Sequence, residues 1–174
     1  MKTVKLALVA IVILIALTSN LAIGQTAPKT RFTENYELFV NETSLDSKTK
    51  EKELVAFMGE PSKKVDYPSG EISYFYEEMG LVFFSKDGNV KGLGVNFNWD
   101  GDEKFPEKTF SGTLSLGEVE INKETKSKGF SANQTVAFDC PFPLMCFSKD
   151  REAKIKCTAA FKETNLTQVV FVIQ

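Results

Sequence analysis

The stretch from residue 63 to residue 97 most constrains the fold, because short apolar segments alternate there with tight turns. Met79-Gly80 predicts a turn between two aromatic strands. Asp87-Gly88 predicts a two-residue hairpin, since this dipeptide readily takes positive φ at both central positions. Consecutive strands joined by such short turns pair antiparallel. The expected strands are 63–67, 71–78, 81–85 and 90–97.

The segment before this meander predicts a strand and one helix. Residues 36–40 are expected to form the strand, and residues 47–58 the helix, whose apolar side chains recur at helical spacing. Gly59 suits the left-handed position after the last turn, and Pro61 prevents continuation. The fold class expected is α+β, with mostly antiparallel sheet and the helix on one face of the first unit.

The chain matches itself at an offset of 76 residues, which predicts two tandem similar units. The second unit has a polar segment, 123–129, where the first has its helix, so the second helix is expected to be short or lost. Chance agreement between generic strand patterns is the alternative. The matching positions include Leu38, Val40, Leu45, Val90 and Val95 on Leu114, Leu116, Ile121, Leu166 and Phe171. The expected organisation is 1–24 signal peptide, 25–35 flexible leader, 36–97 first unit, 98–111 linker and 112–174 second, β-rich unit.

The first 24 residues are typical of a signal peptide. Lys2 and Lys5 precede an apolar run of 12 residues, 6–17, which as a helix reaches roughly 18 Å, well short of a hydrocarbon core of about 30 Å. Small residues at the recognised positions predict cleavage between Gly24 and Gln25. A secreted or periplasmic protein without a membrane span is expected. An uncleaved anchor is the alternative, and no Cys follows the run to carry a lipid.

Charge and composition argue against several classes of function. Loss of Lys2 and Lys5 leaves 19 of the 21 basic residues against 23 acidic residues, a net charge of −4. Because no basic cluster is evident along the sequence, this balance argues against nucleic acid and against anionic lipid as partners. The chain has no His, the usual general base near neutral pH. We expect no enzyme activity, no cofactor and no metal.

Three cysteines allow one disulfide and one remaining thiol in an oxidising compartment. A turn at residues 150–153 would place Cys146 opposite Cys157 across a hairpin, so this pair is favoured. A pairing through Cys140 is the alternative, and three reduced, buried cysteines are a further one. A catalytic thiol is not expected, because the chain offers no imidazole partner.

Register across the two predicted turns places the meander's side chains on two faces. Phe75, Val82, Phe84, Leu93, Val95 and Phe97 are expected to meet the helix. Ile72, Tyr74, Tyr76 and Phe83 are expected on the opposite face with Gly92, Gly94 and Asn96. Tyrosines above glycines suit a protein-binding surface; packing of this face on the second unit is the alternative. Tyr74, Tyr76, Phe83 and Trp99 are the predicted binding residues.

The run Asn98-Trp99-Asp100-Gly101-Asp102 looks like a cation loop but does not fit one. Counted from Asn98, a helix–loop–helix calcium loop needs Gly at its sixth position and an acidic residue at its twelfth. Those positions hold Glu103 and Thr109, so a solvated linker is expected. Trp99 and Phe105 are its expected anchors between the units.

The strand, the helix ending in Gly59-Glu60-Pro61, the aromatic hairpin and Asp87-Gly88-Asn89-Val90 together resemble a secreted bacterial domain family of unknown function. Its architecture is similar to tandem repeats of the small outer-membrane-assembly lipoproteins and of the β-lactamase inhibitory protein. The resemblance implies a non-catalytic domain that binds a protein or envelope component through a sheet face. A small-molecule binder with a pocket between the units is the alternative.

Overall fold

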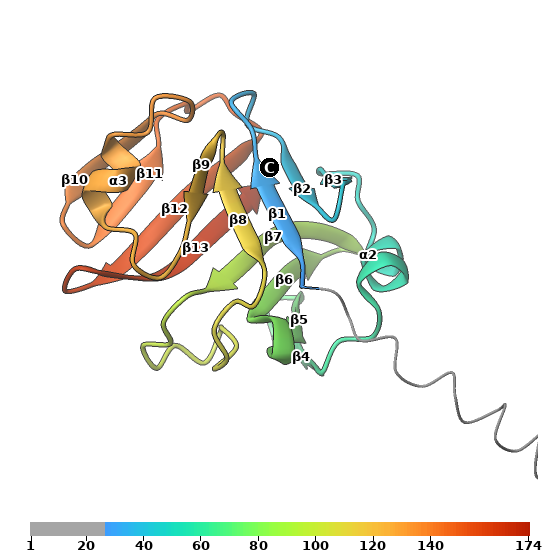
Figure 1. Cartoon of the computed structure of the whole chain (residues 1–174). Coiled ribbons are helices and arrows are strands. Elements are labelled where there is room, and N and C mark those ends of the chain that lie inside the picture. The colour runs from blue at the N-terminus through green and yellow to red at the C-terminus, as the bar shows by residue number, and fades with distance from the viewer. Residues whose placement is uncertain (1–26) are drawn as a thin grey trace, which may run out of the picture.

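The computed structural model describes residues 27–174, and these form two stacked β-sheets with two short α-helices at opposite ends (Figure 1). The proposed signal peptide and its cleavage site at Gly24 and Gln25 lie outside the described residues. No helix in the described part of the chain is both long and apolar enough to cross a membrane. The coarse fold class is confirmed: mostly antiparallel sheet with few helices.

The larger sheet has eight strands in the order β10-β11-β12-β13-β7-β6-β5-β4. All its neighbours pair antiparallel, as the short turns of the sequence predict. Strands β7 and β13 meet in the middle, with Val95 opposite Val169 and Leu93 opposite Phe171. The strands are β4 (Lys63–Asp66), β5 (Glu71–Tyr76), β6 (Leu81–Lys86), β7 (Asn89–Asn96), β10 (Phe138–Phe142), β11 (Met145–Ser148), β12 (Ile155–Lys162) and β13 (Asn165–Ile173).

The smaller sheet has five strands in the order β3-β2-β1-β8-β9, and its central strand corrects a prediction. The leader 25–35 is not wholly flexible, since its residues 29–32 form β1, which pairs antiparallel with β2 and parallel with β8. Thr30 and Phe32 alternate inward and are buried, which gives this short segment its place in the core. The strands are β1 (Lys29–Phe32), β2 (Leu38–Val40), β3 (Thr43–Leu45), β8 (Thr113–Leu116) and β9 (Val119–Ile121).

The first helix follows the prediction in place but is shorter. Helix α2 (Glu51–Met58) begins after the turn at 47–50, where the Thr49 hydroxyl accepts from the Asp46 amide at 3.0 Å. Gly59 follows with φ of 81°, a left-handed value that glycine adopts without strain. Helix α3 (Ser127–Ser131) is the short second helix expected from the polar segment.

The main core lies between the two sheets and under α2. Phe32 of the small sheet lies 5.2 Å from Phe171 of the large sheet, centroid to centroid, and both rings are fully buried. Leu54 and Met58 bury the inner side of α2 against the same cluster. Burial of apolar area from both sheets in one layer is the main stabilising contribution.

The assignment of side chains to the two faces was half right. The face of Phe75, Val82 and Phe84 was expected to meet the helix, and this is wrong. Leu54 and Met58 of α2 pack instead in the cluster that contains the tyrosines. As predicted, Tyr74 and Phe83 share one face and Phe75 and Val82 share the other, although the predicted pairs Tyr76–Phe83 and Phe75–Phe84 are each shifted by two residues. However, a β-bulge between Phe84 and Ser85 in the β6–β7 pairing inserts one extra residue. Because side chains alternate faces, this extra residue moves β7 from Gly92 onward to the opposite assignment, whereas Val90 still pairs with Ser85. Leu93 and Val95 therefore join the tyrosines, and Gly92 and Gly94 join Phe75 and Phe84.

The favoured disulfide was wrong: Cys140 bonds Cys146, with a sulfur–sulfur distance of 2.05 Å, and Cys157 is free and buried. In the β11–β12 pairing Cys146 lies opposite Ala159, two residues beyond Cys157. A longer connection between the strands than the four-residue turn assumed produces this register. The hairpin β10–β11 brings Cys140 beside Cys146 instead.

Candidate functional site

The predicted aromatic binding surface lies in the core. Tyr74, Tyr76 and Phe83 are only 5%, 2% and 0% exposed. The small sheet and helix α2 cover the face on which they lie, so the prediction that these three form an accessible surface is wrong. Neither the alternation of residues nor the hairpin register predicts that a second sheet covers this face.

The hydroxyl groups of these tyrosines tie α2 to the large sheet. Tyr74 donates to Glu51 Oε2 at 2.8 Å, and Ser85 donates to the other carboxylate oxygen at 2.6 Å. Burial, and then the hydrogen bond to Glu51, raise the pKa of Tyr74 to about 12. Tyr76 donates to the carbonyl of Gly59 at 2.9 Å, and burial raises its pKa well above the ordinary value. These contacts fasten α2 to the large sheet and occupy the hydroxyl groups of Tyr74 and Tyr76.

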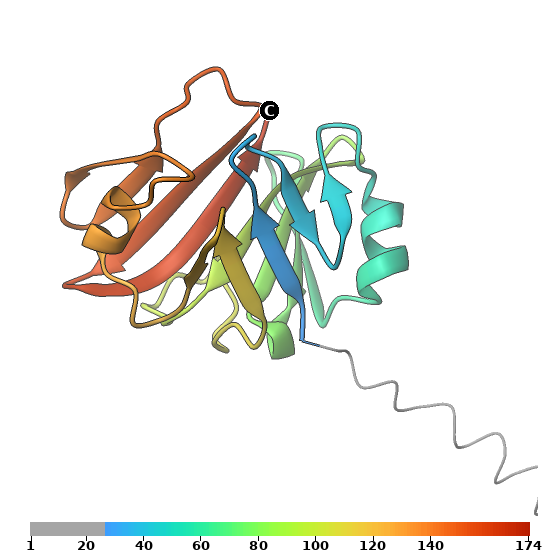
Figure 2. The ribbon, with the colours of Figure 1, turned by 45° about the horizontal axis from the view of Figure 1, so that its top comes forward.

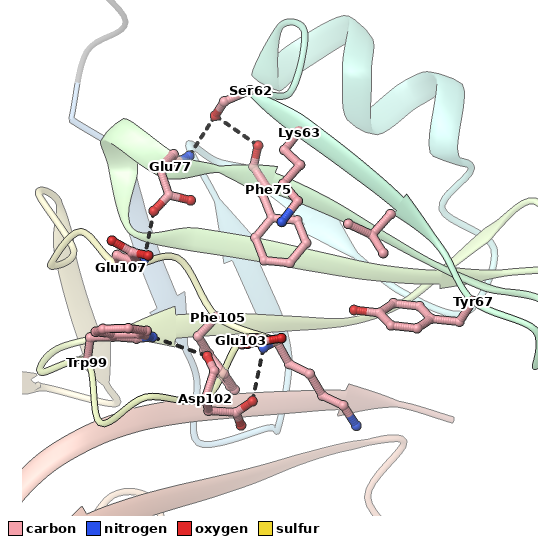
Figure 3. A pocket seen from close by; sticks show the side chains of 12 residues that line it. Ser62, Lys63, Tyr67, Phe75, Glu77, Trp99, Asp102, Glu103, Phe105 and Glu107 are labelled. Atoms are coloured by element: carbon pink, nitrogen blue, oxygen red, sulfur yellow. Dashed lines mark hydrogen bonds between the residues drawn. The ribbon is translucent and has the colours of Figure 1, made fainter.

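The opposite, outer face of the large sheet carries an open groove of about 980 Å³ (Figure 3). One wall comes from β4 and β5, and the other comes from the connection between β7 and β8, residues 97–112, which we call the linker. The groove lies over Phe75, whose ring is 5.2 Å from the Lys63 ammonium. Its lining residues are Ser62, Lys63, Val65, Tyr67, Phe75, Glu77, Trp99, Asp102, Glu103, Lys104, Phe105 and Glu107.

The linker crosses the outer face because Phe105 is buried there. Its ring lies 6.4 Å from that of Phe84, edge to face, and packs in one cluster with Phe75 and Val82. Gly94 leaves room for this ring: a Cβ at that position would lie 2.7 Å from Phe105 Cε1. The glycine that the bulge turns outward thus forms the depression into which the linker docks. Phe105 was predicted as an anchor between the two units; in the structure it packs on the outer face of the large sheet.

Hydrogen bonds hold both sides of the linker. The Glu107 amide donates to Glu77 Oε1 at 2.6 Å, and Lys108 pairs with Glu78 at 2.6 Å, which fixes the linker to the β5–β6 turn. At the other end Asn98 Nδ2 donates to the carbonyl of Leu166 at 2.6 Å. The groove wall therefore has a defined position rather than that of a free loop.

Trp99 stands on the rim of the groove and is 45% exposed. Its indole Nε1–H donates to the carbonyl of Asp102 at 3.2 Å, which orients the ring (Figure 3). It also borders a smaller depression of about 190 Å³ beside the β12–β13 turn, which includes Lys162 and Asn165. Of the four predicted binding residues, Trp99 is accessible, and its role in binding stays a prediction.

Negative charge predominates along the groove. Four carboxylates line it, from Glu77, Asp102, Glu103 and Glu107, against the two ammonium groups of Lys63 and Lys104. Asp102 Oδ1 also accepts from the Lys104 amide at 2.9 Å, and Glu77 accepts from the linker as described. The groove combines an aromatic floor with an acidic rim. Sequence reasoning missed it, because only the path of the linker creates it.

Polar side chains of the linker and of the neighbouring strands hold the linker in place by hydrogen bonds. Asp100 Oδ1 accepts from Gln168 Nε2 and from the Asp102 amide, each at 3.2 Å. Asn96 Nδ2 donates to the carbonyl of Lys108 at 3.0 Å. Within residues 27–174 no three Cys, Asp or Glu side chains are gathered in a way that could hold a metal ion.

Comparison with known proteins gives a family and one solved structure. Residues 31–131 match the model of a domain of unknown function, DUF7738. A cysteine-rich secretory protein from Staphylococcus aureus subsp. aureus Mu50 is similar in structure, with a TM-score of 0.43 and 10% sequence identity, over 72% of this chain and 43% of that chain. The present chain thus spans less than half of that protein. No curated protein matches the sequence.

Proposed function

The chain belongs to the DUF7738 family of domains of unknown function, and we propose that it is an exported, non-catalytic domain that binds a partner protein in the outer groove. The observation that carries the proposal is the accessible Trp99 on the rim of a groove with aromatic floor and acidic edges. An exposed aromatic side chain beside a fixed wall is typical of a binding anchor. The apolar run 6–17 and the disulfide are compatible with export to an oxidising compartment.

The chemistry of the groove defines the partner segment. It would be extended, with an apolar or aromatic side chain over Phe105 and Trp99, and with Lys or Arg side chains toward Glu103 and Glu107. Glu77 and Asp102 accept from backbone amides of the linker and so support the wall. This structural use of Glu77 and Asp102 supports the proposed non-catalytic role.

The alternative, a small molecule between the proposed units, has less support. Two depressions touch both the linker and the second unit. The one bordered by Trp99, Lys162 and Asn165 holds about 190 Å³, below the 300–1,000 Å³ or so of most ligand pockets. The other, an open one lined by Phe84, Phe105 and Val170, holds about 540 Å³. A thermal-shift screen with metabolites would favour this alternative if a compound raised the melting temperature and an Asn165→Ala variant lost the effect.

A fluorescence titration tests the groove directly, because Trp99 is the chain's only tryptophan. We expect soluble peptides that alternate aromatic and basic residues to shift its emission and to bind more weakly as salt rises. Peptides with Asp and Glu in place of the basic residues serve as the matched control. Glu103→Lys should weaken the basic peptides about tenfold or more. Equal response to both peptide sets, or no loss in the variant, would contradict the proposal.

We also propose that the chain is an internal duplication of the two units predicted above. Two long-range hydrogen bonds support it: Lys50 Nζ donates to Asn89 Oδ1, and Lys126 Nζ donates to Asn165 Oδ1, both at 2.7 Å. The second pair lies 76 residues after the first. Both lysines directly precede a helix, α2 in one case and α3 in the other.

The pairing in the middle of the large sheet agrees with this proposal. Leu93 pairs with Phe171 and Val95 with Val169, so each pair maps onto the other under the same offset. Such a register is expected where a pseudo-twofold axis passes between equivalent strands. The proposed likeness to tandem-repeat lipoproteins and to the β-lactamase inhibitory protein depends on this duplication. If members of the family lack self-similarity at this offset, the duplication is wrong.

A further inference from the structure

A second surface, which shares no residue with the groove, carries an exposed apolar tip. The hairpin β10–β11 closes with Pro141-Phe142-Pro143-Leu144-Met145, which contains no polar side chain, and the disulfide joins the cysteines on either side of it. Phe142 is 63% exposed, Leu144 50% and Met145 37%. Figures 1 and 2 place this hairpin at the end of the molecule opposite α2. We call residues 141–145 the apolar tip.

The backbone of the apolar tip has few polar groups left to satisfy. Pro141 and Pro143 have no amide hydrogen, and Phe142 pairs with Met145 in the ladder. The carbonyl of Leu144 accepts from the amide of Phe161 at 2.9 Å. A segment that enters a hydrocarbon layer must satisfy its backbone groups internally, because no water is there to do it. The disulfide also limits the conformational entropy that such a loop would lose on insertion.

Two lysines lie beside the apolar tip. Lys128 and Lys149 line a depression of about 600 Å³ together with Phe142, Pro143 and one carboxylate, that of Asp139. Residues 122–157 as a whole carry seven Lys or Arg against four Asp or Glu, a net charge of +3, whereas the rest of residues 27–174 carries −7. The whole-chain balance, which argued against anionic lipid, conceals this difference between the two ends.

From these observations we propose that the apolar tip inserts into the interface of an anionic lipid bilayer, with Lys128 and Lys149 at the headgroups. Partly exposed apolar side chains beside basic ones are the combination that holds a protein at such an interface. Phe147, 37% exposed on β11, extends the apolar surface toward the sheet. This surface is independent of the groove, so the two proposals can fail separately.

Vesicle sedimentation tests the proposal with the mature protein, purified after export. We expect binding to phosphatidylcholine vesicles that contain about 30 mol% phosphatidylglycerol, with weaker binding as salt rises from about 0.1 to about 0.5 M. The double variant Phe142→Ser/Leu144→Ser should lower the partition coefficient about tenfold or more. Lys128→Glu/Lys149→Glu should abolish the preference for anionic over neutral vesicles. Val119→Ser, at an apolar position of β9 that is 38% exposed, is the matched control and should bind like the wild type.

Three outcomes would overturn the proposal. They are a wild-type protein that ignores anionic vesicles, a Phe142→Ser/Leu144→Ser variant that binds them as well as the wild type, and equal loss in the Val119→Ser control. A wild type that self-associates without binding vesicles, and becomes monomeric in the Phe142→Ser/Leu144→Ser variant, would assign the tip to a second copy of this chain instead. Circular dichroism and the melting temperature check that each variant is folded. We expect all of them to fold, because the substituted side chains are exposed.

Discussion

Replacing Gly94 by Ala should destabilise the protein through one identified ring. The new Cβ would lie 2.7 Å from Phe105 Cε1 and 2.8 Å from Val82 Cγ1, both too close for ordinary contact. Overpacking of this kind costs about 1–3 kcal/mol. For a chain of this length each kcal/mol lowers the melting temperature by about 2–4 °C, so urea or thermal unfolding measures the effect easily.

Removal of the ring tells whether Phe105 is the cause. Phe105→Ala alone should cost about 3 kcal/mol, since the side chain is 7% exposed and packs on the outer face. In that background Gly94→Ala should cost distinctly less, because only the contact with Val82 remains, and the coupling should exceed about 0.5 kcal/mol.

Gly92→Ala is the matched control for this cycle. Its Cβ would meet the backbone oxygen of Phe171 at 2.5 Å, a contact that the loss of Phe105 cannot relieve. Its cost should therefore add to that of Phe105→Ala. A Gly94→Ala variant as stable as the wild type, or a cycle in which both glycines behave alike, would refute the docking of the linker on this face.

Other measurements address the inner layer and the cysteines. The pKa of Tyr74 in the folded protein is raised above its unfolded value near 10, so its contribution to stability is complete below pH 10 and is lost as the pH rises toward about 12. In this interval the folded protein should therefore show less tyrosinate absorbance than the urea-unfolded chain at the same pH. Tyr74→Phe, which also leaves Glu51 with one hydrogen bond fewer, should make this difference smaller. Without reductant, one thiol per chain should react with a thiol reagent in denaturant and none in the native state, since burial raises the pKa of Cys157; three reactive thiols would exclude the disulfide. Replacing Cys140 and Cys146 by Ser should lower the unfolding free energy by about 2 kcal/mol, as expected for so short a closed loop, and an unchanged urea midpoint would contradict this.

The local elements of the fold could be predicted from the sequence. Helix α2 ends where Gly59 and Pro61 indicate, and the turn at Asp87-Gly88 joins β6 to β7. These features depend on residues next to each other in the chain, where backbone preferences decide the structure. The alternation of β5 likewise placed Tyr74 and Tyr76 together on one face.

Features that depend on distant parts of the chain could not be predicted. Strand β1 has only four residues, too few for periodicity to distinguish it from a leader, and its place between β2 and β8 is fixed by tertiary contacts. The bulge opposite Phe84 and Ser85 is indicated in the sequence only by Gly92, since a glycine inside a strand can mark either a bulge or a close backbone approach, yet one inserted residue decides which side of β7 meets the core.

Of the residues that line the outer groove, only Trp99 was predicted from the sequence as a binding residue. Trp99 stands out as the only tryptophan in a polar linker, and it is accessible in the fold. The remaining groove residues come from β4, β5 and the linker, segments whose meeting depends on the docking of Phe105 over Gly94. The tyrosine-rich face attracted the prediction instead, since nothing in the sequence reports the second sheet that covers it.

Photo-crosslinking in the producing cells tests the proposed binding groove most directly. A benzophenone amino acid would replace Glu103 on the groove and, in a separate chain, Glu120 on β9 of the other sheet; both positions are exposed. We expect a defined protein adduct from position 103 that is absent from position 120 and is lost when Trp99→Ala is added. Adducts of equal yield from both positions, or an adduct that persists without Trp99, would contradict a binding site in the outer groove.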